Sequence, residues 1–202
     1  MKPLHHGKSR LAVTADLRQA LSLAMALDTI AGVSASPAVG QVYVVSTDRT
    51  VQQRLGDTVH VLSREPAGGL NAAFGYGLMA ARCNATDSPV ALMMADLPAI
   101  RPREVSAALD YAGRTGRVRV LADASGTGTS VLCVALGAAV TLRFGGHSFI
   151  RHVADGATPI STLGLQGIRQ DVDDIGNLRT AITLGVGCET RRVLSSHRLG
   201  QE

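Results

Sequence analysis

Hydrophobic positions along the chain fall into two kinds of run, which alternate. Residues 90–95 (VALMMA) form a continuous apolar stretch without polar alternation, which is typical of a strand buried on both faces. Residues 15–32 instead repeat their apolar side chains at helical spacing, with Thr14 as the expected N-cap and Gly32 as the expected end. The pattern therefore predicts both helices and buried strands.

The same reading extends along the rest of the chain. Further strands are expected at residues 41–46, 58–62, 117–122 and 129–135, and further helices at residues 71–83, 101–114, 147–156 and 177–186. Strands that alternate with helices predict an α/β fold, with a mostly parallel central sheet flanked by helices. No repeat, low-complexity tract or linker divides the 202 residues, so we expect a single domain over 1–202.

The composition of the chain indicates where in the cell the protein is expected. No stretch approaches the roughly 18 to 20 apolar residues that a membrane span needs, and no signal-peptide pattern follows Met1. Three cysteines at wide spacing, Cys83, Cys133 and Cys188, favour neither a disulfide framework nor a structural zinc site. We therefore expect a cytoplasmic protein with no membrane partner.

The charge of the chain indicates the kind of partner. The formal net charge is +4, and Lys2 and Lys8 are the only lysines, so arginine carries most of the positive charge. The arginines are scattered, and aromatic residues make up only 3%, which offers little for stacking on bases. Small anionic substrates account for this excess better than nucleic acid does.

One carboxylate stands at the end of the buried run. Asp96 follows the predicted strand directly, and in open α/β sheets ligands bind at the carboxyl ends of strands. An alternative is that Asp96 serves as a turn or cap residue for the helix expected near Arg101.

Two cations occur in the stretch GKSR, residues 7–10. Lys8 and Arg10 suit phosphate oxygens, although the stretch lacks the earlier glycine and the preceding strand that a P-loop needs. The alternative is that both are solvated surface charges.

Two glycine-containing loops precede regular elements, GTGT at 126–129 and FGGHS at 144–148. Their backbone N–H groups and hydroxyls would suit a phosphate or carboxylate, and the alternative is that both are tight turns. We expect His147 to be a loop residue and His152 a residue on the helix surface.

The stretch DVDD, residues 171–174, supplies further carboxylates. In an extended segment Asp171 and Asp173 point to the same side, where their repulsion calls for a cation, while Asp173 or Asp174 could cap the helix near Asn177. Placed opposite Asp96, this pair would make an oxygen-only site, which is what Mg²⁺ prefers.

These motifs, taken in order, carry a resemblance to a known family. KPLHHGKSRLA, GLNAAF, ADLPAI, GTGTSVL, FGGHSFIRH and DVDDIGNLRTAITLGVG resemble the guanylyltransferases that activate 2-phospho-L-lactate or phosphoenolpyruvate during synthesis of the deazaflavin coenzyme factor 420. The resemblance spans nearly the whole chain. It implies a Rossmann-like, GT-A-like nucleotidyltransferase fold that uses GTP and a small phosphorylated acid. It also implies a hydrophobic strand ahead of KPL in mid-sheet, and we expect the present sequence to lack that strand.

The resemblance also implies roles for individual residues. Asp96, Asp171 and Asp173 would hold Mg²⁺. Thr129, Gly145 and Ser148 would bind the phosphate and carboxylate of the acceptor. Lys8, Arg10, Gly69 and Asn71 would face the guanine nucleotide.

The implied reaction is attack by the acceptor phosphate on the α-phosphorus of GTP, with loss of pyrophosphate. The resemblance in the stretch LGVGCETRRVL slightly favours phosphoenolpyruvate over phospholactate as the expected acceptor. Two alternatives stay open: a molybdopterin or sugar nucleotidyltransferase, and a non-catalytic protein that binds GTP or another anion. The sequence also leaves a homodimer open as the assembly.

Overall fold

A computed structural model describes residue 11 and residues 13–57, 59–64, 66–84, 87–113 and 116–197. Its helices are α1 (Ala15–Ser34), α2 (Arg49–Arg54), α3 (Gly69–Asn84), α4 (Pro102–Gly113), α5 (Ser148–Ala154), α6 (Ile175–Leu184) and α7 (Cys188–Ser196), with a short 3₁₀ helix η2 (Gly167–Arg169). Its strands are β1 (Val42–Val45), β2 (Val59–Leu62), β3 (Val90–Met93), β4 (Arg119–Ala122), β5 (Thr129–Val134) and β6 (Thr158–Pro159). Each helix and strand expected from the sequence is present, and α2, β6, η2 and α7 are additional.

The strands form two groups rather than one mostly parallel sheet. β1 and β2 pair in parallel, and the other four strands have the order β3-β5-β4-β6. β5 runs antiparallel to both β3 and β4, while β4 and β6 are parallel. The short loop after β4 returns the chain directly along its neighbour, so this connection makes a hairpin instead of a crossover. The α/β class is confirmed, and the larger sheet is mixed.

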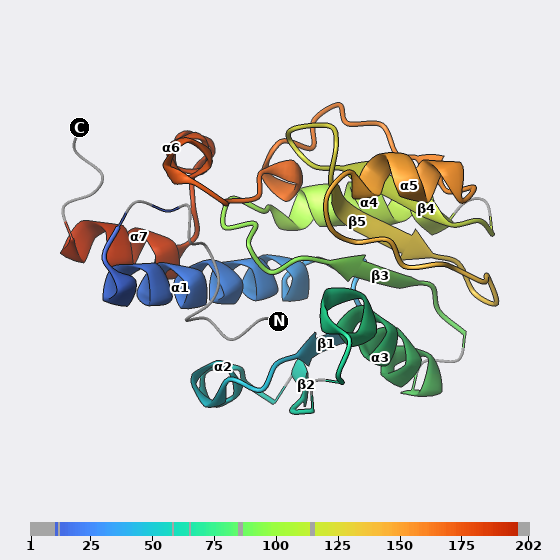
Figure 1. Ribbon diagram of the computed structural model, residues 1–202, viewed down its shortest axis with the longest axis horizontal. Helices are drawn as coiled ribbons and strands as arrows, with labels where there is room; N and C mark the ends of the chain where they lie inside the picture. Colours follow the sequence, from blue (N-terminus) through green and yellow to red (C-terminus); the bar gives the residue numbers. More distant parts are fainter. Residues whose placement is uncertain are drawn as a thin grey trace.

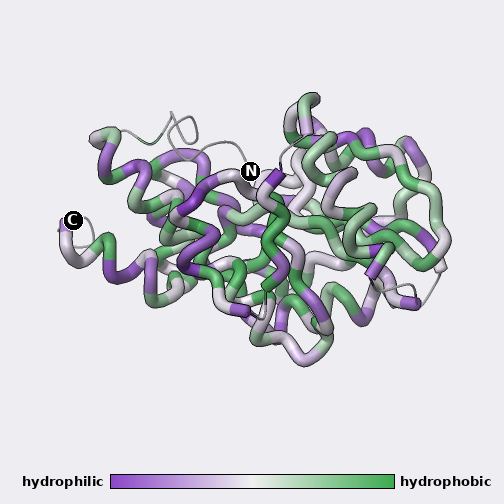
Figure 2. The backbone as a smooth tube through the Cα atoms, turned by 90° about the horizontal axis from the view of Figure 1, so that it is seen from below, coloured by the Kyte–Doolittle hydropathy of each residue, from purple (hydrophilic) through white to green (hydrophobic). Residues whose placement is uncertain are grey.

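Helices cover both faces of the larger sheet (Figure 1). β5 is buried along its whole length, and Leu132 and Val134 pack with α3 and the start of α5. Val131 and Cys133 point the other way and pack against α4. The strict alternation of side chains along a strand therefore divides the core into two clusters. In Figure 2 the hydrophobic stretches of the tube run mainly through the interior.

A cavity separates the two groups of strands. Its volume is about 720 Å³, and it is lined by β1, by residues 90–95 and by apolar side chains of α1, α3 and α4. Among the residues that the structure describes, β1 pairs only with β2 and β3 only with β5. No described strand therefore lies between β1 and β3.

Helix α1 begins as predicted and ends later than predicted. The Thr14 hydroxyl accepts from the backbone N–H of Leu17 at 3.4 Å, and the helix continues through Gly32 to Ser34. A Cβ atom on Gly32 would lie only 2.6 Å from Cγ2 of Ile100. Gly32 therefore permits close packing of the helix, and the prediction that it ends the helix is wrong.

Helix α7 is hydrogen-bonded to helix α1. The Asp28 side chain in α1 is 6% exposed and accepts hydrogen bonds from the backbone N–H groups of Glu189 (3.0 Å) and Thr190 (2.8 Å). These N–H groups belong to the first turn of α7, which has no partners for them within its own helix. A carboxylate from α1 thus takes the place of a local cap. Across the described residues, no helix is both long and apolar enough to span a bilayer.

Candidate active site

The two acidic stretches lie side by side. The backbone N–H of Val172 donates to the carbonyl oxygen of Asp96, at 3.2 Å, just beyond the end of β3. Val172 is fully buried among side chains of α1, α6 and α7. Asp171 is half-buried and Asp173 is exposed, as expected of residues that flank a buried neighbour in an extended segment. The segment 171–173 therefore borders the strand end that carries Asp96.

One of the three aspartates in the stretch 171–174 caps a helix. Asp174 is the N-cap of α6, and its carboxylate accepts from the backbone N–H of Asn177 at 2.8 Å. The Asn177 side chain accepts from the backbone N–H of Asp174 at 3.2 Å, which completes a capping box. The cap interpretation is confirmed for Asp174, and the helix begins at Ile175, two residues before Asn177.

Within the described residues no three His, Cys, Asp or Glu side chains gather closely enough to hold a metal ion. The assignment of Asp96, Asp171 and Asp173 as metal ligands stays a prediction. Helix α4 begins at Pro102, and the alternative role of Asp96 as a turn or cap residue ahead of it also stays open.

Two side chains that sequence reasoning did not single out hold the acidic segment in place. The buried carboxylate of Glu104 in α4 accepts from the backbone N–H groups of Gly167 (3.0 Å) and Ile168 (2.9 Å). The Arg169 guanidinium donates to the carbonyl oxygens of Ala122 (2.9 Å) and Asp123 (2.6 Å). Both contacts join residues far apart in the sequence, which gives them no local signal. The segment ahead of Asp171 is thereby tied to α4 and to the end of β4.

The GTGT loop does not offer its backbone donors to a ligand. Asp123 accepts from the N–H groups of Thr127 (3.1 Å) and Gly128 (3.0 Å) and from the hydroxyl of Ser125 (2.8 Å). This corrects the expectation that the backbone N–H groups of Thr127 and Gly128 are available to bind an anion, because a carboxylate of the chain already accepts from both. Thr129, the first residue of β5, has a buried side chain.

The loop before α5 packs against the glycine loop and α3. The N–H of Phe149 donates to the carbonyl oxygen of Thr127 at 3.0 Å, which joins the two loops. The N–H of Ser148 donates to the carbonyl oxygen of Gly145 at 3.1 Å. Gly145 has a φ of 120°, a backbone conformation that glycine adopts without a steric penalty. Residues 129, 145 and 148 thus belong to one connected region, and the Ser148 side chain is buried.

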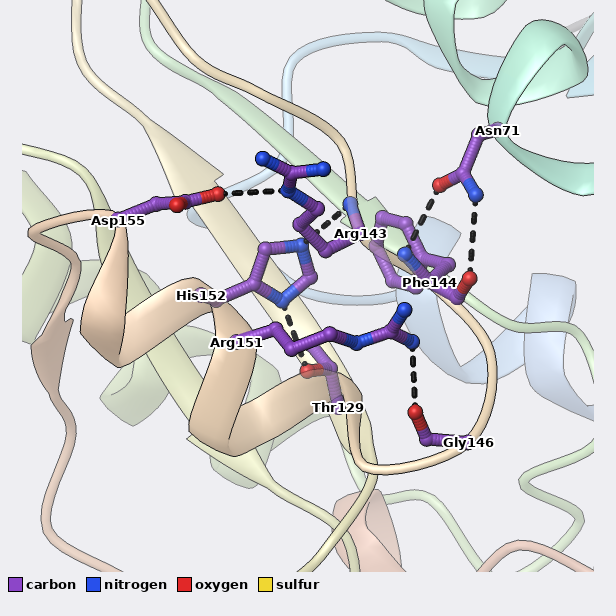
Figure 3. Close-up of polar contacts among 8 residues, drawn as sticks. All are labelled: Asn71, Thr129, Arg143, Phe144, Gly146, Arg151, His152 and Asp155. Atoms are coloured by element: carbon purple, nitrogen blue, oxygen red, sulfur yellow. Dashed lines mark hydrogen bonds and ion pairs between the residues drawn. The ribbon is translucent and has the colours of Figure 1, made fainter.

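Asn71 lies on the same side of the molecule as this loop. Its side-chain amide donates to the carbonyl oxygen of Phe144 (3.1 Å) and accepts from the N–H of Phe144 (2.8 Å) (Figure 3). Both ends of the amide therefore position the loop. Gly69 is the first residue of α3, with a φ of 73°. Lys8 and Arg10 lie outside the described residues.

His152 is buried rather than on the helix surface, so that prediction is wrong. Only 1% of the residue is exposed, and its ring meets the ring of Phe144 edge to face at a centroid distance of 5.2 Å. Burial lowers the pKa of His152, Asp155 raises it, and Arg151 and Arg143 lower it. His147, with a φ of 55°, is the exposed loop residue expected from the sequence.

The architecture matches a solved structure. The chain superimposes on a protein described as a putative nucleotide-diphospho-sugar transferase from Desulfovibrio desulfuricans G20, with a TM-score of 0.64. The match covers 95% of this chain and 93% of that chain at 14% sequence identity, so it defines the fold. The protein thus has the fold of the nucleotide-diphospho-sugar transferases.

Sequence comparison then places the chain within a family. The model of the family described as "Guanylyl transferase CofC like" matches residues 1–195, and the chain belongs to that family. It is 44% identical to the phosphoenolpyruvate guanylyltransferase of Streptomyces coelicolor, over 96% of this chain and 92% of the relative. It is 42% identical to the enzyme of the same name from Streptomyces avermitilis, over 94% and 89%. The predicted resemblance is confirmed.

Proposed function

We propose that this chain transfers GMP from GTP to the phosphate of phosphoenolpyruvate and releases pyrophosphate, as a step in synthesis of coenzyme factor 420. The observation that carries the proposal is the match, over nearly the whole chain, to relatives named phosphoenolpyruvate guanylyltransferase. 2-Phospho-L-lactate is the second acceptor to consider, because it differs from phosphoenolpyruvate only in the three-carbon skeleton.

The bond changes balance without a redox partner. An acceptor phosphate oxygen forms a bond to the α-phosphorus of GTP, and the bond from that phosphorus to the bridging oxygen of the β-phosphate breaks. The acceptor phosphate is already ionised at neutral pH, so the protein need not remove a proton. Positioning of the two phosphates and compensation of their charge are the main tasks of such a site.

Mg²⁺ is part of the proposal. Asp96, Asp171 and Asp173 would hold the ion, and their carboxylate oxygens are ligands that this hard cation prefers. The hydrogen bond between Val172 and Asp96 supports the set, because it fixes the backbones of both acidic stretches beside each other. When bound, Mg²⁺ would neutralise charge on the phosphates.

The other residues of the proposed site bind the acceptor. The hydroxyls of Thr129 and Ser148 would donate to its phosphate and carboxylate, and Gly145 would allow the loop to approach them. Arg143 and Arg151 add positive charge on the same loop and helix (Figure 3). Lys8, Arg10, Gly69 and Asn71 are proposed to face the guanine nucleotide, and Asn71 also positions the loop before α5 through Phe144.

The test is pyrophosphate release from GTP, with and without Mg²⁺, in separate reactions that contain phosphoenolpyruvate, 2-phospho-L-lactate or 3-phosphoglycerate. We expect release with phosphoenolpyruvate and its loss when EDTA is added. Unchanged pyrophosphate release after addition of EDTA would reject the role of Mg²⁺. Binding of GTP by folded protein with no release for any acid would reject the transferase and favour the non-catalytic alternative. Stronger activity with molybdopterin or a sugar phosphate would favour those transferases.

A further inference from the structure

The imidazole of His152 links Thr129 to the loop before α5. Its Nδ1 lies 3.0 Å from Oγ1 of Thr129, and its Nε2 lies 3.0 Å from the backbone nitrogen of Arg143. Figure 3 shows the ring between these two partners. Neither contact was predicted from the sequence.

The partners determine where the ring proton lies. The backbone N–H of Arg143 can only donate, so Nε2 is the acceptor and carries no proton. A neutral imidazole then carries its proton on Nδ1, which donates to Oγ1 of Thr129. Burial lowers the pKa of His152 and so favours the neutral ring, the charge of Asp155 raises the pKa, and those of Arg151 and Arg143 lower it.

This arrangement fixes the role of the Thr129 hydroxyl. A threonine hydroxyl has one proton and two lone pairs, and one lone pair already accepts from Nδ1. The hydroxyl proton cannot point at Nδ1, because that atom holds its own proton. It is directed to some other acceptor.

A β-bulge turns Thr129 toward His152. In the pairing of β4 with β5, Leu121 faces Val131 but the next residue, Ala122, faces Thr129, so one extra residue is inserted at Ser130. Val131 packs toward α4, and simple alternation would send Thr129 to that same face. The inserted residue reverses its direction, so that Thr129 meets α5 instead. Bulges of this kind commonly re-aim a side chain beside an active site.

We propose that His152 is a positioning residue that holds the Thr129 hydroxyl as a hydrogen-bond donor for the anionic acceptor acid. The proposal rests on the proposed function, and His152 itself does not touch the substrate. Because Oγ1 accepts from the ring, its single donor is directed at the phosphate or carboxylate of the acceptor. Without the ring, the hydroxyl could rotate and lose this direction.

The first test is independent of catalysis. Nitrogen-15 NMR of the unliganded wild-type protein near pH 7.5 reports which ring nitrogen of His152 is protonated, with His152→Phe used to assign the signal. We expect a neutral ring with its proton on Nδ1. A proton on Nε2, or a charged ring, would overturn the proposal even if the enzyme is active.

The second test is a double-mutant cycle between His152→Phe and Thr129→Val, read as the KM for phosphoenolpyruvate and the KM for GTP. Thr129→Val should raise the KM for phosphoenolpyruvate about 10-fold or more, the size expected for loss of a hydrogen bond to a charged group. His152→Phe should raise it in the same direction with the KM for GTP unchanged. In the Thr129→Val background, His152→Phe should add less than about 2-fold.

Thr129→Ser is the matched control, because it keeps the hydroxyl and should keep the dependence on His152. Fully multiplicative effects in the double variant, or equal increases in both KM values, would show a merely structural histidine and overturn the proposal. If His152→Phe fails to fold, His152→Asn takes its place, because it also removes the ring signal and so assigns the NMR spectrum. Its amide can still donate near the position of Nδ1, so its KM for phosphoenolpyruvate should stay close to that of the wild type, and a KM raised as for Thr129→Val would overturn the proposal. A wild-type protein that turns over no acid would reject the proposed function and leave the proton assignment to be judged by NMR.

Discussion

The carbonyl oxygen of Asp96 accepts a hydrogen bond from the backbone N–H of Val172 at 3.2 Å, which joins the chain just after β3 to an acidic segment 76 residues later. If both stretches hold Mg²⁺, Asp96→Asn and Asp173→Asn should each lower pyrophosphate release by at least about 100-fold, as loss of a group that stabilises developing charge does. The free energy of unfolding should change little.

The matched control is Asp174→Ala. It removes the N-cap of α6 and should cost about 0.5 to 2 kcal/mol of stability while the rate per folded molecule is retained. Asp96→Asn protein with wild-type turnover would remove Asp96 from the site.

Glu104 should matter for stability more than its position in the first turn of α4 suggests. Glu104→Gln replaces one acceptor oxygen with an amide that faces a backbone N–H, so we expect a loss of about 1 to 3 kcal/mol in urea unfolding. Asp110→Asn removes an exposed carboxylate from the same helix and should have almost no effect. Equal stability of the two variants would contradict the role given to Glu104.

Acidification should destabilise the protein through His152. The ring faces Arg143, Arg151, Asp155 and the Phe144 ring, and the net result is a pKa below the ordinary value of 6.5. The unfolded chain therefore binds a proton more readily, so stability should fall as the pH drops from about 7 toward 5. Urea unfolding at several pH values gives the free energy of unfolding as a function of pH. Between pH 7 and 5 this free energy should fall less steeply for His152→Phe than for the wild type.

The three cysteines should differ in reactivity. Burial raises the pKa of the Cys133 thiol to about 12, whereas Cys83 and Cys188 are exposed. A thiol-specific reagent at neutral pH should label Cys83 and Cys188 in the folded protein and Cys133 only after unfolding. Cys133→Ala should give the same labelling in both states. Rapid labelling of Cys133 in the folded protein would contradict the packing of β5.

Much of the fold could be predicted because periodicity reports burial. The runs at 90–95 and 129–135 are apolar without alternation, and β3 and β5 occupy them. β5 is buried throughout, but the prediction that residues 90–95 are buried on both faces is wrong, because among the described strands β3 pairs only with β5 and residues 90–95 line the cavity. α2 and α7 were missed because both are short and mostly polar. Leu194 of α7 packs into the core beside α1, but the cap of its first turn is a carboxylate of α1 that is distant in the sequence.

The sequence predicts members of the candidate site only where their position relative to a strand or helix is enough to identify them. Asp96 stands at a strand end, and the approach of the 171–173 segment follows from the sheet crevice. His152 was misjudged because its burial depends on a loop and a bulge formed elsewhere. The occupation of the GTGT loop by Asp123 likewise depends on side-chain contacts that spacing does not report.

The bond between Asp28 and the first turn of α7 also bears on how the chain is made. Asp28 leaves the ribosome 162 residues before Thr190, whose N–H is its closest partner. At about 5 to 20 residues per second, the carboxylate waits roughly 8 to 30 seconds for that partner. During this time α1 cannot take its final packing without burying an unsatisfied charge. Helix α7 is therefore needed before α1 can pack fully. A chain whose translation is arrested before α7 should keep α1 incompletely packed and accessible to chaperones.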